Sequence, residues 1–177
     1  MPKPGSPHLC LALLLTCSSA LILAQGPKDA APGTYLTKAE MATELKTAPN
    51  PNAALIDRPV RVIDANGHYL GVASVQRISA DVNALVHDKI DEIYYVQEGA
   101  GTLLTGGTLV NGRQTGASVS IGPGWNGTGI TGGVSKRVAP GDVIMIPAGT
   151  PHMFSQLDGT IRYLVYRIDP AKVIGLK

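Results

Sequence analysis

Residues 141–156 of this chain read GDVIMIPAGTPHMFSQ, and this stretch determines the predicted fold. Its apolar half, VIMI, predicts a short strand, and residues 147–151 (PAGTP) form a stiff turn. His152 then projects from a second strand, 152–157. Because a turn containing proline and glycine restricts backbone freedom, little entropy is lost when His152 binds a metal ion.

Short β-strand patterns continue on both sides of this stretch. Asn66-Gly67, for example, is a two-residue hairpin signal between two apolar segments. Residues 38–46 form the one convincing helix, because Thr37 and Glu40 have the spacing of a capping box. Short strands joined by tight turns predict an all-β sandwich, jelly roll or small barrel. The expected strands cover residues 60–64, 68–78, 83–87, 92–98, 143–146, 152–157 and 160–168.

His87 and Glu92 form a second site of interest, five residues apart. An odd spacing places two side chains on opposite faces of one continuous strand. With a turn at 88–91, His87 instead ends one strand and Glu92 begins its neighbour, and both side chains point inward. Two adjacent strands then offer an imidazole and a carboxylate to one ion, which His152 can also reach.

The two segments together resemble the motifs of the cupin superfamily. The first family motif is His-x-His, three or four residues, Glu, six residues, Gly, and here it reads Leu85, His87, Glu92 and Gly99. The second is Gly, five residues, Pro-x-Gly, two residues, His, three residues, Asn, and here it reads Gly141, Pro147, Gly149, His152 and Gln156. The resemblance covers residues 59–168. It implies a double-stranded β-helix, or jelly-roll barrel, and it implies a homodimer. The predicted helix at 38–46 precedes this barrel.

Leu85 replaces the first histidine of the first motif. Metal-binding cupins are similar in using three histidines and one glutamate, whereas this chain keeps His87, Glu92 and His152. Two histidines and one carboxylate form the ligand set of non-haem Fe(II) oxygenases, and the same set holds Zn²⁺. Mn²⁺ and Ni²⁺ are equally compatible with it. The alternative is a degenerate cupin, whose barrel is dry or holds an organic ligand without metal.

The resemblance and the ligand set predict an enzyme that acts on a small organic molecule with one divalent metal ion. We favour oxygenase-type chemistry over isomerase or lyase chemistry, because the triad leaves three metal positions open. The competing hypothesis is a barrel that binds or senses a small ligand without turnover, with or without a metal ion. The discriminating observations are the metal content of the protein and the ligand binding of its histidine variants.

Four further residues have predicted positions near this site. Tyr94 shares the inward face of Glu92, either as a proton donor or as a barrel aromatic. Phe154 and Gln156 alternate with His152, which predicts an apolar wall and an amide behind the ligands. His68, beside the Asn66-Gly67 turn, is expected to be structural, with replacement of the missing ligand as the alternative.

Residues 104–135 are rich in glycine and contain Trp125, the one tryptophan. Their pattern predicts a long connection between the two halves of the barrel. Long connections are often functional, so one interpretation is a lid over the barrel mouth that includes Trp125. The other is a solvated surface loop whose Trp125 packs onto the barrel wall.

The N-terminus predicts export to the periplasm or the exterior. Residues 9–24 form an apolar run after Lys3, which is typical of a secretory signal peptide, with an uncleaved anchor as the alternative. Both cysteines lie in this run, so the mature chain would have no thiol and no disulfide. The expected organisation is a signal peptide at 1–24, a leader with the helix at 25–58, and the barrel at 59–177.

The number and distribution of charged residues indicate which binding partners to expect. The formal net charge is +2 and the basic residues are scattered, which excludes the basic stripe of a nucleic-acid-binding protein. No membrane span is expected once the signal peptide is removed. The expected partners are therefore a small molecule and a second copy of the chain.

Overall fold

The computed structural model describes Met1 and residues 32–177, so the predicted signal peptide lies outside the described residues. Residues 35–177 form one compact unit. Its helix is α1 (Lys38–Lys46). Its strands are β1 (Leu55–Asp64), β2 (Tyr69–Arg77), β3 (Ala84–His87), β4 (Asp91–Glu98), β5 (Gly101–Thr105), β6 (Thr108–Val110), β7 (Arg113–Ser118), β8 (Gly122–Gly127), β9 (Gly129–Thr131), β10 (Val134–Val138), β11 (Val143–Ile146), β12 (His152–Leu157) and β13 (Ile161–Asp169).

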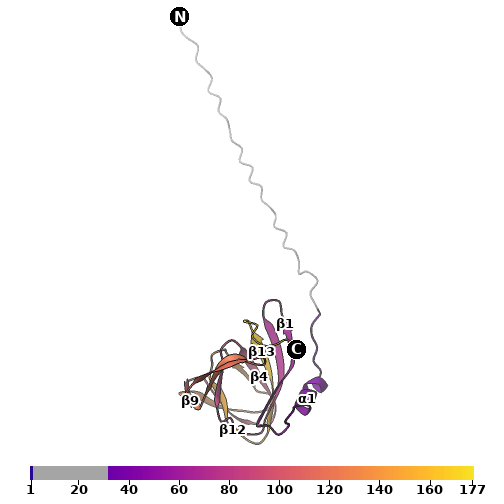
Figure 1. Cartoon of the computed structure of the whole chain (residues 1–177), viewed down its shortest axis with the longest axis vertical. Helices are drawn as coiled ribbons and strands as arrows, with labels where there is room; N and C mark the ends of the chain where they lie inside the picture. The colour runs from indigo at the N-terminus through magenta and orange to yellow at the C-terminus, as the bar shows by residue number, and fades with distance from the viewer. Residues whose placement is uncertain (2–31) are drawn as a thin grey trace. The chain divides into compact units, whose positions relative to one another are not determined.

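The strands form two main antiparallel sheets, which confirms the predicted all-β jelly-roll fold (Figure 1). One sheet has five strands in the order β1-β2-β13-β4-β11, and the other has six in the order β10-β5-β12-β3-β8-β7. A short β6-β9 ribbon completes the described strands. Side chains from the inner faces of both main sheets meet in one core, as in other sandwich and jelly-roll proteins.

The core occupies one half of the barrel interior. Tyr163, Val165 and Val75 come from the five-stranded sheet, and Phe154 and Leu103 come from the six-stranded sheet. Because directly paired residues share a face, the register of β13 with β2 places Tyr163 beside Val75. Burial of these large side chains is the main stabilising term of the barrel.

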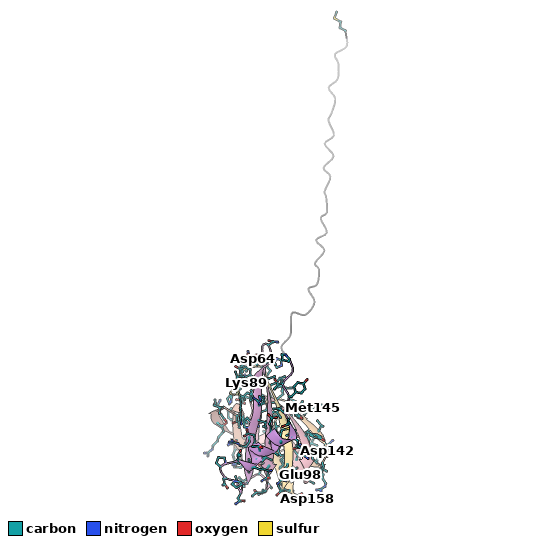
Figure 2. The ribbon with its side chains drawn as sticks, turned by 90° about the vertical axis from the view of Figure 1, so that its right-hand side faces the viewer. Asp64, Lys89, Glu98, Asp142, Met145 and Asp158 are labelled. Atoms are coloured by element: carbon teal, nitrogen blue, oxygen red, sulfur yellow. The ribbon has the colours of Figure 1, made fainter. Side chains whose placement is uncertain are left out.

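Figure 2 shows the two ends of the barrel through three of its labelled residues. Asp158 lies near the end where β12 and β13 join, which is the end of the core, and Asp64 lies at the opposite end, beside the β1–β2 turn. Lys89, in the turn between β3 and β4, is on the Asp64 side. The candidate site described below belongs to this second end.

Helix α1 has the predicted bounds and the predicted capping box. The Thr37 hydroxyl accepts a hydrogen bond from the Glu40 amide, while the Glu40 carboxylate accepts one from the Thr37 amide. The helix contacts β1 and β2, and the Ser74 hydroxyl donates to the Met41 carbonyl oxygen at 2.9 Å. The first strand begins at Leu55, earlier than the predicted boundary at 59. Within the described residues, no helix is long and apolar enough to cross a membrane.

The prediction of a long connection over 104–135 was wrong, because most of this segment is β-structure. β8 pairs with β3, and β7 pairs with β8, so the segment adds two strands to the six-stranded sheet. At one position of this segment, glycine is required by a close contact with the neighbouring strand. A Cβ at Gly124 would collide with the carbonyl oxygen of Val86 on the neighbouring strand.

Candidate metal centre

Three predicted residues converge inside the barrel. His87 ends β3 and His152 begins β12, both in the six-stranded sheet, whereas Glu92 lies on β4 in the facing sheet. The Oε2 atom of Glu92 is 3.6 Å from His87 Nε2 and 3.7 Å from His152 Nε2. The turn between His87 and Glu92 is therefore confirmed, but it joins two facing sheets rather than two adjacent strands. The carboxylate approaches the imidazoles from across the barrel.

All three side chains are buried. The exposed fraction is 6% for His87, 2% for Glu92 and 2% for His152. Burial lowers the pKa of the His87 imidazole, and it lowers the pKa of His152 to about 4. Both imidazoles are consequently neutral near pH 7, which is the form that binds a metal ion.

The orientation of His152 is set by its backbone neighbour. Its Nδ1 atom lies 3.0 Å from the carbonyl oxygen of Thr150, and a carbonyl can only accept, so we assign the proton to Nδ1. The Nε2 atom then carries a lone pair directed toward Glu92. This nitrogen is buried and has no hydrogen-bond partner among the described residues. A buried acceptor without a partner is costly unless an ion, a ligand or a water molecule satisfies it.

Arg167 was not predicted as part of the site, yet it holds the carboxylate of Glu92. The two residues are direct cross-strand partners, and Arg167 Nε donates to Glu92 Oε1 at 3.0 Å. The other end of the guanidinium donates to both carboxylate oxygens of Asp57. Burial raises the pKa of Glu92, but the charge of Arg167 and the nearby His87 and His152 outweigh it and lower that pKa to about 2. Glu92 is therefore an ionised carboxylate with one oxygen engaged and the other facing the histidines.

These atoms fit a bound metal ion. Ligand atoms about 2.1 Å from one tetrahedral ion are about 3.4 Å apart, close to the two distances from Glu92 Oε2. The three ligand atoms all lie within 4.8 Å of one another. An ion between them would satisfy the orphaned nitrogen of His152 and leave Glu92 Oε1 to Arg167. The donor set and its protonation states thus match a divalent ion.

Leu85 and Tyr94 border the triad. Leu85 is half-buried and pairs directly with His152, so it lies on the same inner face in the position where a further ligand would lie. Tyr94 is buried, and its hydroxyl donates to Glu92 Oε2 at 2.9 Å. Burial raises the pKa of the Tyr94 hydroxyl well above its usual value, so this group keeps its proton.

Of the two residues predicted to follow His152 on the inner face, the structure places only Phe154 there. Phe154 is buried against Tyr163, with ring centroids 5.6 Å apart. The prediction for Gln156 was wrong, because a β-bulge between Phe154 and Gln156 shifts the alternation of side chains. Gln156 is exposed, and its amide oxygen accepts a hydrogen bond from the Thr102 hydroxyl.

Of the two predicted positions of Trp125, the structure agrees with the one on the barrel wall and not with the lid. Trp125 pairs with Val86 and Gly124 pairs with His87, so Trp125 lies on the opposite face of the sheet from the triad. Its exposed fraction is 40%. It covers the outside of the barrel, near Gly112. His68 lies in the β1–β2 turn, and it does not belong to the metal-ligand cluster of the described residues.

The C-terminal segment after β13 closes the Asp64 end of the barrel. Ile174 packs with Val62 and Ile90 in a small apolar cluster. Backbone hydrogen bonds join Lys177 to Val62 and Gly175 to Val119. Since Ile90 lies in the turn between His87 and Glu92, this cluster anchors that turn.

Comparisons with known proteins find distant structural likenesses. No protein-family model and no curated protein matches the chain. Among solved structures, it is similar to Peruvianin-I, a cysteine peptidase from Thevetia peruviana latex, with 14% identity, 80% of this chain and 82% of that chain covered, and a TM-score of 0.48. It is also similar to the EutQ protein of Clostridium difficile (16% identity, 73% and 79% covered, TM-score 0.42) and to KdgF from a Halomonas species (16%, 68% and 84%, 0.42). Likenesses at this level carry no argument about activity.

The class of protein follows from the chain's own geometry. Two antiparallel sheets face each other, and His87, Glu92 and His152 meet between them. This is the jelly-roll fold that the resemblance to cupins implies, with a cluster of ligand atoms that can hold a metal ion.

Proposed function

We propose that this protein binds one divalent metal ion through His87, Glu92 and His152 and acts there on a small organic molecule. The single observation that carries the proposal is the Nε2 atom of His152. It is buried, has no hydrogen-bond partner among the described residues, and lies 3.7 Å from an ionised carboxylate oxygen. Neutral imidazoles beside a carboxylate are suited to Fe²⁺, Zn²⁺, Mn²⁺ or Ni²⁺.

The surrounding residues would prepare the site for chemistry. A bound ion supplies Lewis-acid activation of a substrate oxygen or, for iron, access to O₂. Arg167 orients Glu92 so that one oxygen faces the ion position, and Leu85 leaves a ligand position unfilled. Tyr94 keeps its proton and lies against Glu92 Oε2, from which it can donate to a substrate oxygen. The open positions favour oxygenase-type chemistry over isomerase or lyase chemistry.

The second candidate function is binding of a small ligand without turnover. It is favoured by burial, because the triad is almost entirely inaccessible to solvent. Neither of the two described cavities has His87, Glu92 or His152 in its lining. A substrate would therefore have to enter by displacing covering residues, whereas a resident ligand or ion would not have to exchange.

Metal analysis of the purified protein tests the metal site on which the enzyme proposal depends. We expect one equivalent of a divalent ion in the wild type, and none in His87→Ala or His152→Ala. A His68→Ala variant is the matched control, because that histidine lies outside the cluster. If the wild type holds no stoichiometric metal and the triad variants keep ligand binding, the enzyme proposal fails.

We also propose that the chain is exported to the periplasm or the exterior and that it forms a homodimer. The apolar run 9–24 supports export, and the cupin resemblance supports the dimer. N-terminal sequencing of the mature protein tests cleavage after the predicted signal peptide. Light scattering during gel filtration tests the dimer, and a monomeric mass would contradict it.

A further inference from the structure

A polar cavity lies at the free edge of the six-stranded sheet and has a volume of about 440 Å³. Its walls come from strands β7 and β8 and from residues that lie next to β3, β7 and β8 in the sequence. They contain one cationic side chain and several amides, and they contain no acidic group. The lining residues are Asn83, Asn111, Gly112, Arg113, Asn126, Gly127 and Thr128.

The strand register connects this cavity to the triad. Arg113 pairs with Asn126, Asn126 pairs with Leu85, and Leu85 pairs with His152. Residues directly opposite each other in a sheet point to the same face, so this row lies on the inner face of the six-stranded sheet. Since adjacent strands are about 4.8 Å apart, the backbones of Asn126 and His152 are separated by about 10 Å.

The polar groups of the cavity are available to a ligand. Arg113 is exposed and takes part in no ion pair within the described part of the chain. Asn126 and Asn83 are exposed, and among described residues their side-chain amides make no hydrogen bond to protein. The Asn111 amide donates to the Thr128 hydroxyl at 3.0 Å, which leaves its oxygen free to accept.

This set of groups selects an anion with a single negative charge. A guanidinium binds a carboxylate through two parallel hydrogen bonds, and neighbouring amides can bind hydroxyl or carbonyl oxygens. A phosphate monoester carries nearly two negative charges and would be poorly matched by one arginine. The other described cavity, between α1 and the outer face of the five-stranded sheet, does not share a face with the triad.

We propose that the Arg113–Asn126 cavity binds the carboxylate end of the substrate, and that the substrate is a small carboxylic acid. Its other end would extend along the inner face, past Leu85, toward the metal position. Arg113 lies one strand beyond Asn126, so its backbone is about 14 Å from that of His152, and the arginine side chain spans part of this distance. This inference rests on the proposed function and names the substrate class of that site.

The test measures binding of a defined panel to the metal-reconstituted full-length protein. The probes are linear hydroxy and keto acids of two to eight carbons, the amide of each acid, and inorganic phosphate. Isothermal titration calorimetry gives the dissociation constant of each probe. We expect acids to bind more tightly than their amides, and Arg113→Met to weaken acid binding about threefold or more, the range of a solvent-screened ion pair.

Arg137→Met is the matched control. Arg137 is exposed on β10, at the opposite edge of the same sheet, where it pairs with Asp158. We expect it to bind the acids as the wild type does. Thermal unfolding and metal titration of all variants verify that Arg113→Met keeps its fold and its ion.

The proposal is overturned if no acid of the panel binds, if amides bind as tightly as acids, if phosphate binds better than every acid, or if Arg113→Met binds like the wild type. Failure of the metal site has a different result. In that case no variant takes up a divalent ion, and the metal titration of the wild type shows this before any acid is added.

Discussion

Arg167 and Glu92 are cross-strand partners joined by a hydrogen bond of 3.0 Å, and this contact divides the roles of the two oxygens of Glu92. Oε1 belongs to the guanidinium, and Oε2 faces both histidines. Asp57 holds the far side of the same guanidinium. The chain therefore supports its candidate ligand with a buried ion pair, and the loss of either partner exposes a charge to an apolar interior.

Replacement of Arg167 tests this support. Arg167→Met leaves two carboxylates without their cation, so we expect the metal-free protein to lose about 3–5 kcal/mol of unfolding free energy in urea titrations. Addition of Zn²⁺ should restore more stability to this variant than to the wild type, because the ion supplies positive charge beside Glu92. Arg162→Met is the control on the same strand, where the arginine is half-buried and pairs with Glu98, away from the triad. If Arg162→Met loses as much unfolding free energy as Arg167→Met, a special role for Arg167 is contradicted.

Leu85 faces His152 directly, so its substitution changes the number of ligands. We expect Leu85→His to bind Zn²⁺ about tenfold more tightly than the wild type, equivalent to about 1.4 kcal/mol. Competition with a chromogenic chelator measures the dissociation constant. Leu85→Asn is the control, since it adds polarity without an imidazole. Equal affinities of the histidine and asparagine variants would show that position 85 does not face the ion.

Tyr94→Phe removes the hydroxyl that donates to Glu92 Oε2. A hydrogen bond to a charged group stabilises a protein by about 1.5–3 kcal/mol, so the metal-free variant should be less stable by about that amount. Its Zn²⁺ affinity should be unchanged or higher, because the hydroxyl no longer competes for Oε2. Tyr163→Phe is the comparison, since its hydroxyl accepts from Arg77 instead. Weaker Zn²⁺ binding by Tyr94→Phe alone would contradict this geometry.

Acid should destabilise the metal-free barrel through the buried triad. Burial lowers the pKa of His152 to about 4, and Arg167 with the two histidines lowers that of Glu92 to about 2 against the effect of burial. In both cases the unfolded chain binds more protons than the folded chain, so stability falls as pH falls. The contribution of His152 is lost between about pH 6.5 and 4, and that of Glu92 between about pH 4.5 and 2.

Urea titrations of chelator-treated protein from pH 7 to pH 4 measure this loss. A His152→Gln variant should show a shallower decline than the wild type over that interval, because it lacks the buried imidazole. Identical slopes would mean that His152 does not titrate as a buried group.

The sequence predicted the features that depend on local pattern. Helix 38–46 followed from its capping box, and the positions of His87 and His152 followed from turns beside short strands. Pairing between distant strands was harder to predict. The segment GPGWNG (122–127) shows no apolar alternation, because glycine at 124 is required by close approach to β3, and so the strand looked like a loop.

Two site residues show the same limit. The outward turn of Gln156 depends on a bulge that a strict period of two does not reveal. Arg167 lies two residues after the buried Val165 and four after the buried Tyr163. This alternation along one strand was a usable signal for an inward position. The sequence could not show that its partner would be Glu92, since that contact joins strands that are far apart in the chain.

The most direct test of the central claim is the metal stoichiometry of the full-length protein after reconstitution and gel filtration. We expect about one divalent ion per chain in the wild type, as one cluster of three ligands holds one ion. We expect none in the Glu92→Gln, His152→Ala double variant. A wild-type protein that retains no ion under these conditions would contradict the metal site, and so would a double variant that retains as much metal as the wild type.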